Sequence, residues 1–257
     1  MSFTFKFLGP GTSVGVPQIG CNCSVCTSAD PRDRRRRCGA YVRSGKVAFL
    51  VDTPPEMREA ALEYGIDRVD AVCLTHAHMD HIAGFDDVRR FNTLNGSVPM
   101  RCHAMPETGE QMHRIFPYIS DKPNEQGLFR PMIRFRDEAS FSLGDISVER
   151  LPVGHGFPCC GYLFGGRQGL AYISDCHDLP DVTVERLKGV GTLVINCLRE
   201  RPHPTHLNTE RMLAYVARIS PVRTFITHIC HDIGHAEWQR RLPEGIEPAY
   251  DGLELEI

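Results

Sequence analysis

Side chains of the types that bind metals are concentrated in one short stretch, at His76, His78, Asp80 and His81. His76 and His78 are two positions apart, so an extended backbone points both imidazoles in the same direction. Asp80 and His81 follow where we expect the chain to turn into a helix, and they can face a second ion. Two ions roughly 3.5–4 Å apart are the arrangement of two-metal hydrolysis. The alternative, a solvated histidine-rich loop, leaves the later candidate ligands unexplained.

Three further candidate ligands each follow a segment with the pattern of a strand. His155 follows residues 151–154, Asp175 follows residues 169–174, and His228 follows residues 223–227. Binding sites gather at strand ends in α/β sheets because the loops converge there. Taken alone, His155 or Asp175 is better explained as a core or turn residue. Together with the first four residues, these three predict one site with seven ligands.

Short apolar or alternating runs predict the strands that position these residues. They cover residues 1–8, 46–52, 70–74, 146–153, 169–175, 191–197, 223–227 and 252–257. Helical patterns fall between some of them, at residues 55–64, 82–94, 182–188, 208–219 and 235–242. Strands with interspersed helices predict a layered α/β domain. We see no repeat or linker and expect a single domain of residues 1–257, within which residues 96–140 have no clear pattern.

Composition excludes some classes of protein. The 257 residues are 42% hydrophobic and carry a net charge of −3, which gives no strong attraction to nucleic acid or membranes. No run of 18 apolar residues predicts a transmembrane helix. Several of the eleven cysteines lie in apolar runs, which indicates a reducing cytoplasm rather than a disulfide framework. The oligomeric state stays open, and a homodimer remains one of the options.

A second metal-type pattern lies near the N-terminus, where Cys21, Cys23 and Cys26 have the spacing C-x-C-x-x-C. Thiolates at this spacing are typical of a structural zinc site, which needs a fourth ligand. Burial of three free thiols is disfavoured because Asn22 and Ser24 make this loop polar. His231, three residues after His228, is the favoured fourth ligand, and Cys230 is the competing candidate.

Two histidines, His203 and His206, precede a predicted helix start at residue 208. Cleavage of a phosphodiester needs a proton for the departing alkoxide, and a histidine can supply it near neutral pH. We favour His206 over His203 for this role; both could also be surface loop residues. An arginine run at residues 34–37 could grip phosphate, although a role in bracing a loop is the favoured interpretation.

The stretch from Thr75 to His81 resembles the signature of the metallo-β-lactamase superfamily, and the later candidate ligands match that superfamily in order. The resemblance implies an αββα four-layer sandwich. It implies that one metal is held by His76, His78 and His155, and the other by Asp80, His81 and His228. Asp175 would bridge the two metals. Asp52 matches an aspartate that usually supports the site without binding metal.

Within that superfamily the cysteine pattern is similar to the PhnP-type cyclic phosphodiesterases. In that family three cysteines and a histidine bind a structural zinc, and the matching residues here are Cys21, Cys23, Cys26 and His231. The family also carries a catalytic histidine in the region of His203 and His206. The resemblance therefore implies two catalytic divalent metals, zinc or manganese with iron as a further option, and one structural zinc.

The expected function is hydrolysis of a small phosphodiester, with a cyclic one favoured, by a hydroxide held between two metals. His206 or His203 would act as the acid, and Asp80 would serve in catalysis as well as in metal binding. Three alternatives are kept. They are a transfer-RNA 3′-processing endonuclease, a thioester or lactone hydrolase of the same superfamily, and a metal-stabilised binding protein without catalysis. A polymeric nucleic acid is the less favoured partner, because no basic bias is visible.

Overall fold

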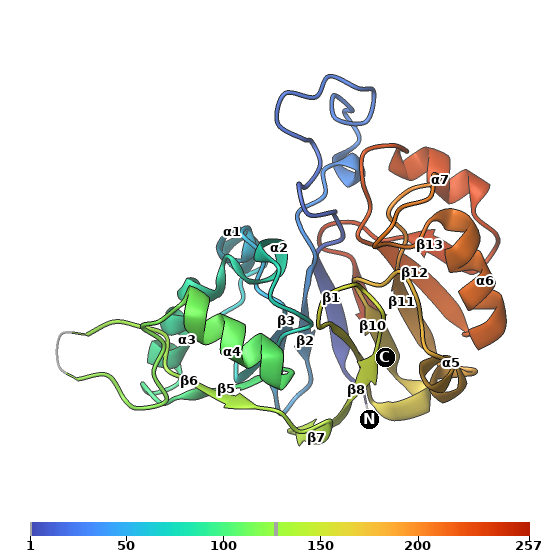
Figure 1. The fold of residues 1–257 in the computed structure, drawn as a ribbon. Coiled ribbons are helices and arrows are strands. Elements are labelled where there is room, and N and C mark those ends of the chain that lie inside the picture. The colour runs from blue at the N-terminus through green and yellow to red at the C-terminus, as the bar shows by residue number, and fades with distance from the viewer. Residues whose placement is uncertain (1, 126–127) are drawn as a thin grey trace.

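The computed structural model describes residues 2–125 and 128–257. Two seven-stranded β-sheets pack face to face, and helices cover the outer face of each sheet (Figure 1). The fold is the αββα sandwich that the resemblance to the metallo-β-lactamase superfamily implies. Within the described ranges no helix has the length and apolar character needed to cross a membrane.

The first sheet has the strand order β14-β1-β2-β3-β4-β5-β6. Its strands are β1 (Thr4–Gly9), β2 (Gly39–Arg43), β3 (Ala48–Val51), β4 (Ala71–Cys73), β5 (Met100–His103), β6 (Ile133–Arg136) and β14 (Glu254–Glu256). On its outer side lie α1 (Met57–Glu63), α2 (Met79–Ile82), α3 (Val88–Leu94) and α4 (Pro106–Ile115). Strands β3 to β6 are parallel, so their carboxyl ends lie at one edge.

The second sheet has the order β13-β12-β11-β10-β9-β8-β7. Its strands are β7 (Ser140–Leu143), β8 (Ile146–Pro152), β9 (Cys160–Phe164), β10 (Leu170–Ile173), β11 (Thr192–Asn196), β12 (Arg223–Thr227) and β13 (Ile246–Pro248). The helices on its outer side are α5 (Asp181–Leu187), α6 (Thr209–Ile219) and α7 (His235–Arg241). Strands β10 to β13 are parallel, so this sheet also gathers strand ends at one edge.

Strand β3 is apolar at every position because both of its faces are buried. Phe49 and Val51 belong to the core between the two sheets, where the Phe49 ring lies 5.5 Å from that of Phe164. Ala48 and Leu50 belong to the core between the sheet and its helices. Successive strand residues face opposite sides, and both sides are covered here, so no position favours a polar residue.

The helix predicted over residues 82–94 is wrong as a continuous element. The chain forms α2, a 3₁₀ turn η2 (Phe85–Asp87) and then α3. Gly84 explains the interruption, because a Cβ atom there would lie 2.3 Å from the Pro54 carbonyl oxygen. The Gly84 N–H donates to the Thr53 carbonyl oxygen at 2.9 Å instead of continuing a helix. The close approach of residues 53 and 54 therefore ends α2.

Sequence patterns do not reveal β2 and β9, nor β5, α4 and β6 within residues 96–140. Strand β9 contains Gly161, where a Cβ atom would lie 2.9 Å from the Tyr172 carbonyl oxygen. Strand β6 alternates arginine with apolar residues over four positions and pairs with β5. Such short segments become strands through pairing with neighbours, which a sequence window does not contain. Residues 126 and 127 lie outside the described ranges.

Candidate active site

All seven predicted ligands lie together where strands of the two sheets end. Four of them lie in the loop between β4 and α2 and at the start of α2: His76, His78, Asp80 and His81. The other three lie in the loops after β8 (His155), β10 (Asp175) and β12 (His228). Parallel strands bring their carboxyl ends to one edge, and this places residues far apart in sequence beside one another. The structure thus brings together the complete predicted set.

One cluster consists of three imidazoles. Nε2 of His76 lies 2.9 Å from Nδ1 of His78, and Nε2 of His155 lies 3.4 Å from the same Nδ1. The Nδ1–H of His155 donates to the Thr205 carbonyl oxygen at 3.0 Å, which leaves its Nε2 without a proton in the neutral ring. Three converging imidazole nitrogens match the ligand types that zinc, manganese and iron accept.

The second cluster combines Asp80, His81 and His228. Oδ2 of Asp80 lies 3.3 Å from Nε2 of His81 and 3.6 Å from Nε2 of His228. Asp175 lies between the two clusters: its Oδ2 is 3.1 Å from His81 Nε2, and its Oδ1 is 3.1 Å from His228 Nε2. The same Oδ1 is 3.9 Å from His155 Nε2. Asp175 can therefore contact ions in both clusters.

The polar atoms that face this centre fit bound cations. Within the described residues, His81 Nε2, His228 Nε2 and Asp175 Oδ2 are buried without a hydrogen-bond partner. Burial disfavours a charged His81, but the carboxylates of Asp175 and Asp80 outweigh it and raise its pKa well above the usual value. Burial opposes ionisation of Asp175, yet His228 and His81 hold its pKa well below the usual value. Divalent cations would compensate the same carboxylates in place of protons.

Asp52 holds this arrangement from outside the clusters. It is fully buried and accepts hydrogen bonds from the Thr75 N–H at 2.8 Å, the Thr75 hydroxyl at 2.8 Å and His81 Nδ1–H at 2.7 Å. The Thr75 hydroxyl in turn lies 3.0 Å from Nδ1 of His76. Asp52 therefore directs the Nε2 atom of His81 toward the centre and, through Thr75, orients His76.

Two residues of this region have a left-handed backbone that side chains other than glycine rarely adopt. Asp52 has φ 60° and His228 has φ 57°. Such conformations cost of order 1–3 kcal/mol and persist where surrounding contacts impose them. Each occurs directly after a strand, at the point where the side chain must turn toward the metal centre.

An open cleft of about 500 Å³ exposes the centre, and its lining includes Ser13, Phe157 and His206. The Phe157 ring stacks on His78 with centroids 4.6 Å apart. The His206 ring stacks on His228 at 4.4 Å, and its Nδ1 lies 3.7 Å from Asp175 Oδ1. Burial lowers the pKa of His206 to about 2, so its neutral imidazole is strongly favoured when the cleft holds no anion.

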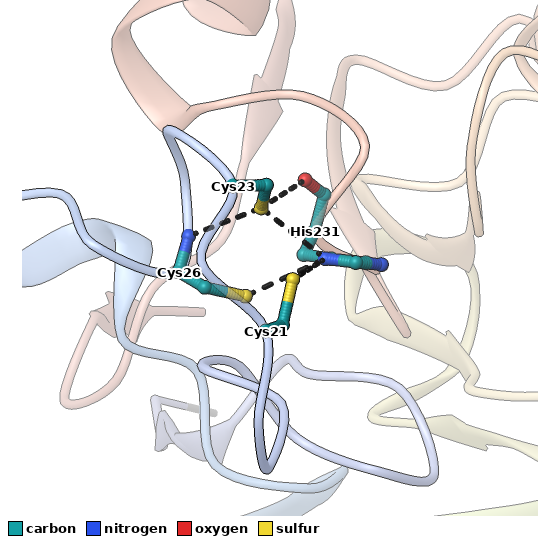
Figure 2. A group of neighbouring side chains, drawn as sticks. All are labelled: Cys21, Cys23, Cys26 and His231. Carbon is teal, nitrogen blue, oxygen red and sulfur yellow. Dashed lines mark hydrogen bonds between the residues drawn. The ribbon is translucent and has the colours of Figure 1, made fainter.

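The cysteine cluster forms a separate site, shown in Figure 2. The Sγ atoms of Cys21, Cys23 and Cys26 lie 3.3, 3.3 and 3.4 Å from Nδ1 of His231. A hydrogen bond from the Cys26 N–H is the main cause that lowers the pKa of Cys23 to about 6. Three thiols around one imidazole nitrogen match the donor set of a structural zinc site.

The competing candidate Cys230 lies outside this cluster. Its Sγ accepts from the Asp232 N–H at 3.4 Å, and its side chain is buried. His231, the favoured fourth residue, is the one that the structure brings to the three thiols.

Comparison with known proteins identifies the family. A family model described as "Beta-lactamase superfamily domain" matches residues 48–229. The crystal structure of a "New Diphosphatase from the PhnP Family" is 37% identical, superposes with a TM-score of 0.91 and covers 100% of this chain and 98% of that one. The chain belongs to the PhnP family of the metallo-β-lactamase superfamily. It is accordingly a superfamily hydrolase with a cluster of residues that could bind divalent metals.

Other relatives of this PhnP-family chain carry different names. An octanoyltransferase of Porphyromonas gingivalis is 34% identical over 97% of the chain, which spans 51%, about half, of that relative. A ribonuclease Z of Phocaeicola vulgatus is 22% identical over 63% of the chain and 55% of its own length. The family assignment therefore leaves the substrate to be argued from the site.

The arginine run of this PhnP-family chain does not line the metal cleft. Arg35 is fully buried. Arg36 pairs with Glu63, and Arg37 pairs with Glu56. These contacts agree with a bracing role rather than with direct contact to substrate.

Sequence reasoning missed three residues at the cleft. Ser13 lies in the glycine-rich segment before the cysteines, Phe157 follows His155 by two positions, and Thr205 contributes its carbonyl oxygen to His155. A short distance from a predicted ligand could have pointed to Phe157. Ser13 reaches the cleft only because residues 11 and 12 pair with Ile229.

Proposed function

We propose that this protein hydrolyses small phosphate diesters, cyclic ones among them, with the help of two divalent ions of zinc, manganese or iron. The observation that carries the proposal is the pair of ligand clusters joined by Asp175 in one open cleft, with His206 beside them. A site that served stability alone would need neither a shared carboxylate nor access from solvent.

The bound ions and the residues that hold them would have different roles in hydrolysis. Bound divalent ions would lower the pKa of water and neutralise phosphate oxygens. Asp80 and Asp175 bring negative charge that would otherwise repel a phosphate, so cations are needed before an anionic substrate can approach. Asp52 and the Thr205 carbonyl hold His81 and His155 in the tautomers that leave Nε2 available.

His206 is our proposed proton donor for the departing oxygen. It lines the cleft and stacks on His228. Burial lowers its pKa, but a phosphate anion at the neighbouring centre would favour its protonated form. His203 is the weaker candidate, because its Nδ1 accepts from the Thr205 N–H at 3.3 Å and it does not line the cleft.

The walls of the cleft favour a small substrate. Among the described residues, those that line the cleft include no lysine or arginine. A long RNA would need a basic surface to neutralise its backbone phosphates, and the net charge of the chain is −3. The 37% identical PhnP-family diphosphatase is named for action on a diphosphate, so diphosphate esters belong in the substrate test.

The test compares substrate classes on protein loaded with Zn²⁺ or Mn²⁺. Bis(p-nitrophenyl) phosphate, a 2′,3′-cyclic nucleotide and a nucleoside diphosphate ester are assayed beside an aryl thioester and a precursor transfer RNA. We expect metal-dependent turnover of the small diesters. Turnover of the thioester or the RNA alone would replace the proposal with the corresponding alternative. Bound metal with turnover of none of them would indicate a binding protein.

His206→Ala should separate substrates by their leaving groups. An alkoxide leaves poorly without a proton, so the variant should lose about 10²–10⁴-fold on an alkyl diester. It should lose much less on the nitrophenyl diester, whose leaving group departs unprotonated. His203→Ala is the matched control and should show no such difference. Equal losses of His206→Ala on both substrates would exclude the role, and leaving-group dependence in His203→Ala alone would transfer it.

A further inference from the structure

Arg35 is an arginine whose side chain is completely buried next to the loop that carries His228. One guanidinium nitrogen, Nη1, donates to the Cys230 carbonyl oxygen at 2.6 Å. The other, Nη2, donates to the Ile233 carbonyl oxygen at 3.1 Å and to Asp33 Oδ1 at 3.0 Å. The exposed fraction of the Arg35 side chain is 0%. Burying a guanidinium is costly unless its charge is paired and its donors find acceptors. Here Asp33 and two carbonyl oxygens serve Nη1 and Nη2, while the buried Nε has no partner among the described residues.

The same contacts fix both ends of the loop after His228. The Asp33 carboxylate that pairs with Arg35 also accepts from the His235 N–H at 2.6 Å. Arg35 and Asp33 thus hold the backbone at residues 230, 233 and 235. Earlier in the loop, the Ile229 N–H donates to the Pro10 carbonyl oxygen and the Ile229 carbonyl accepts from the Thr12 N–H. Residues 229 to 235 are therefore held in place by contacts with residues 10, 12, 33 and 35.

His228 needs such support because its backbone is strained. Its φ of 57° is unfavourable for a histidine, and relaxation would turn the imidazole away from Asp80 and Asp175. The loop also carries His231, which lies between the two carbonyls that Arg35 holds. Backbone pairing of Arg35 with Val16, at 2.8 and 2.9 Å, ties the same residue to the segment that leads into the cysteines.

We propose that Arg35 is a positioning residue for the metal cluster of Asp80, His81 and His228. It acts through the backbone of the loop at residues 228–235 and contacts neither metal nor substrate. The planar guanidinium reaches two carbonyl oxygens and one carboxylate at once, which the single ammonium of a lysine cannot reproduce. The inference rests on the two-metal centre of the proposed function and is independent of which ester is cleaved.

The effect should fall on one metal cluster. Loss of a group that orients a ligand typically weakens metal binding by about 10–100-fold. In Arg35→Lys we therefore expect the ion held by Asp80, His81 and His228 to bind about 10–100-fold less tightly. The cluster of His76, His78 and His155 should keep its affinity, because its residues lie on other loops. Amide hydrogens of residues 229–235 should exchange faster in the same variant.

The experiment titrates Mn²⁺ into metal-free protein by calorimetry, since imidazole and carboxylate suit this ion better than thiolates do. Amide exchange is measured in parallel. Arg186→Lys, at an exposed pair with Glu149, controls for the chemical change, and Leu187→Ala, a buried site under the second sheet, controls for lost stability. Arg35→Met is a second variant that removes the charge.

Selective weakening of one Mn²⁺ site in Arg35→Lys, absent from Leu187→Ala, would support the role. Unchanged affinity, or equal weakening of both sites, would overturn it. If the unaltered protein bound fewer than two Mn²⁺ ions in the centre, the proposed two-metal function would fail instead.

Discussion

Replacement of Asp52 by asparagine should weaken metal binding without altering any metal ligand. The carboxylate accepts from the Thr75 N–H through Oδ1, and from the Thr75 hydroxyl and His81 Nδ1–H through Oδ2. In Asp52→Asn the amide oxygen must face the Thr75 N–H, because an NH₂ group there would place two donors together. The NH₂ group then faces His81. In the neutral ring that metal binding requires, His81 can accept from it only if its single proton moves to Nε2, the atom directed at the metal centre.

The magnitude follows from these contacts. If His81 keeps its present tautomer, one buried donor is left unsatisfied, at a cost of about 1–3 kcal/mol in folding stability. If the proton moves, the folded state is less affected and metal binding weakens by about 10–100-fold. We expect the second outcome to dominate, since the side-chain amide introduced by Asp52→Asn can donate to the freed Nδ1.

Calorimetric titration of metal-free protein with Mn²⁺ measures the affinity, and thermal unfolding of the metal-free form measures the stability. Asp145→Asn is a suitable control, because that carboxylate accepts from the Ser44 hydroxyl, a contact made outside the metal centre. Mn²⁺ affinities within about twofold of the unaltered protein at both sites would refute the argument that Asp52 selects the His81 tautomer.

Two further predictions concern other parts of the molecule. Cys23→Ser should lower the zinc content by about one equivalent and reduce thermal stability, because a structural zinc contributes folding free energy directly; an unchanged zinc content by elemental analysis would argue against the cysteine site. His103 is buried against Phe141, and burial lowers its pKa from 6.5 to about 4, so its unfolded form takes up a proton first as the pH falls. The unaltered protein therefore loses folding stability progressively as the pH falls from 6.5 toward 4. The variant His103→Phe lacks this proton uptake, so its stability relative to the unaltered protein should rise by about 2 kcal/mol as the pH falls from 8 to 5. Denaturant unfolding at both pH values measures this, and a constant difference would contradict it.

Much of the fold could be predicted because its strong elements have local patterns. The strands that lead to Asp52 and Asp175, β3 and β10, are apolar throughout, since both of their faces are covered. The helix over residues 208–219 was recognisable, and Asn208 caps its start by accepting from the Arg211 N–H. Strands such as β6 and β9 escaped prediction because pairing with neighbouring strands, rather than residue pattern, makes them strands.

The candidate ligands could be predicted for a related reason. His76, His78, Asp80 and His81 occupy one strand-to-helix turn, and spacing within such a turn fixes which way the side chains point. Asp175 and His228 follow strands, and strand ends of parallel sheets meet. Residue type and local geometry together were enough to name the set.

Contacts between distant segments were decided only by the tertiary structure. His231 rather than Cys230 faces Cys21, across 210 positions of sequence, and His206 rather than His203 lines the cleft. Arg35, one of four consecutive arginines, is the one buried beneath the loop of His228. The sequence by itself determined which metal-binding and proton-donating side chains are present and where each lies relative to its strand or helix. Packing determined which of several neighbouring side chains reaches a partner. Side chains one to three positions apart along a loop point in different directions, and a sequence pattern does not show which of them faces the partner.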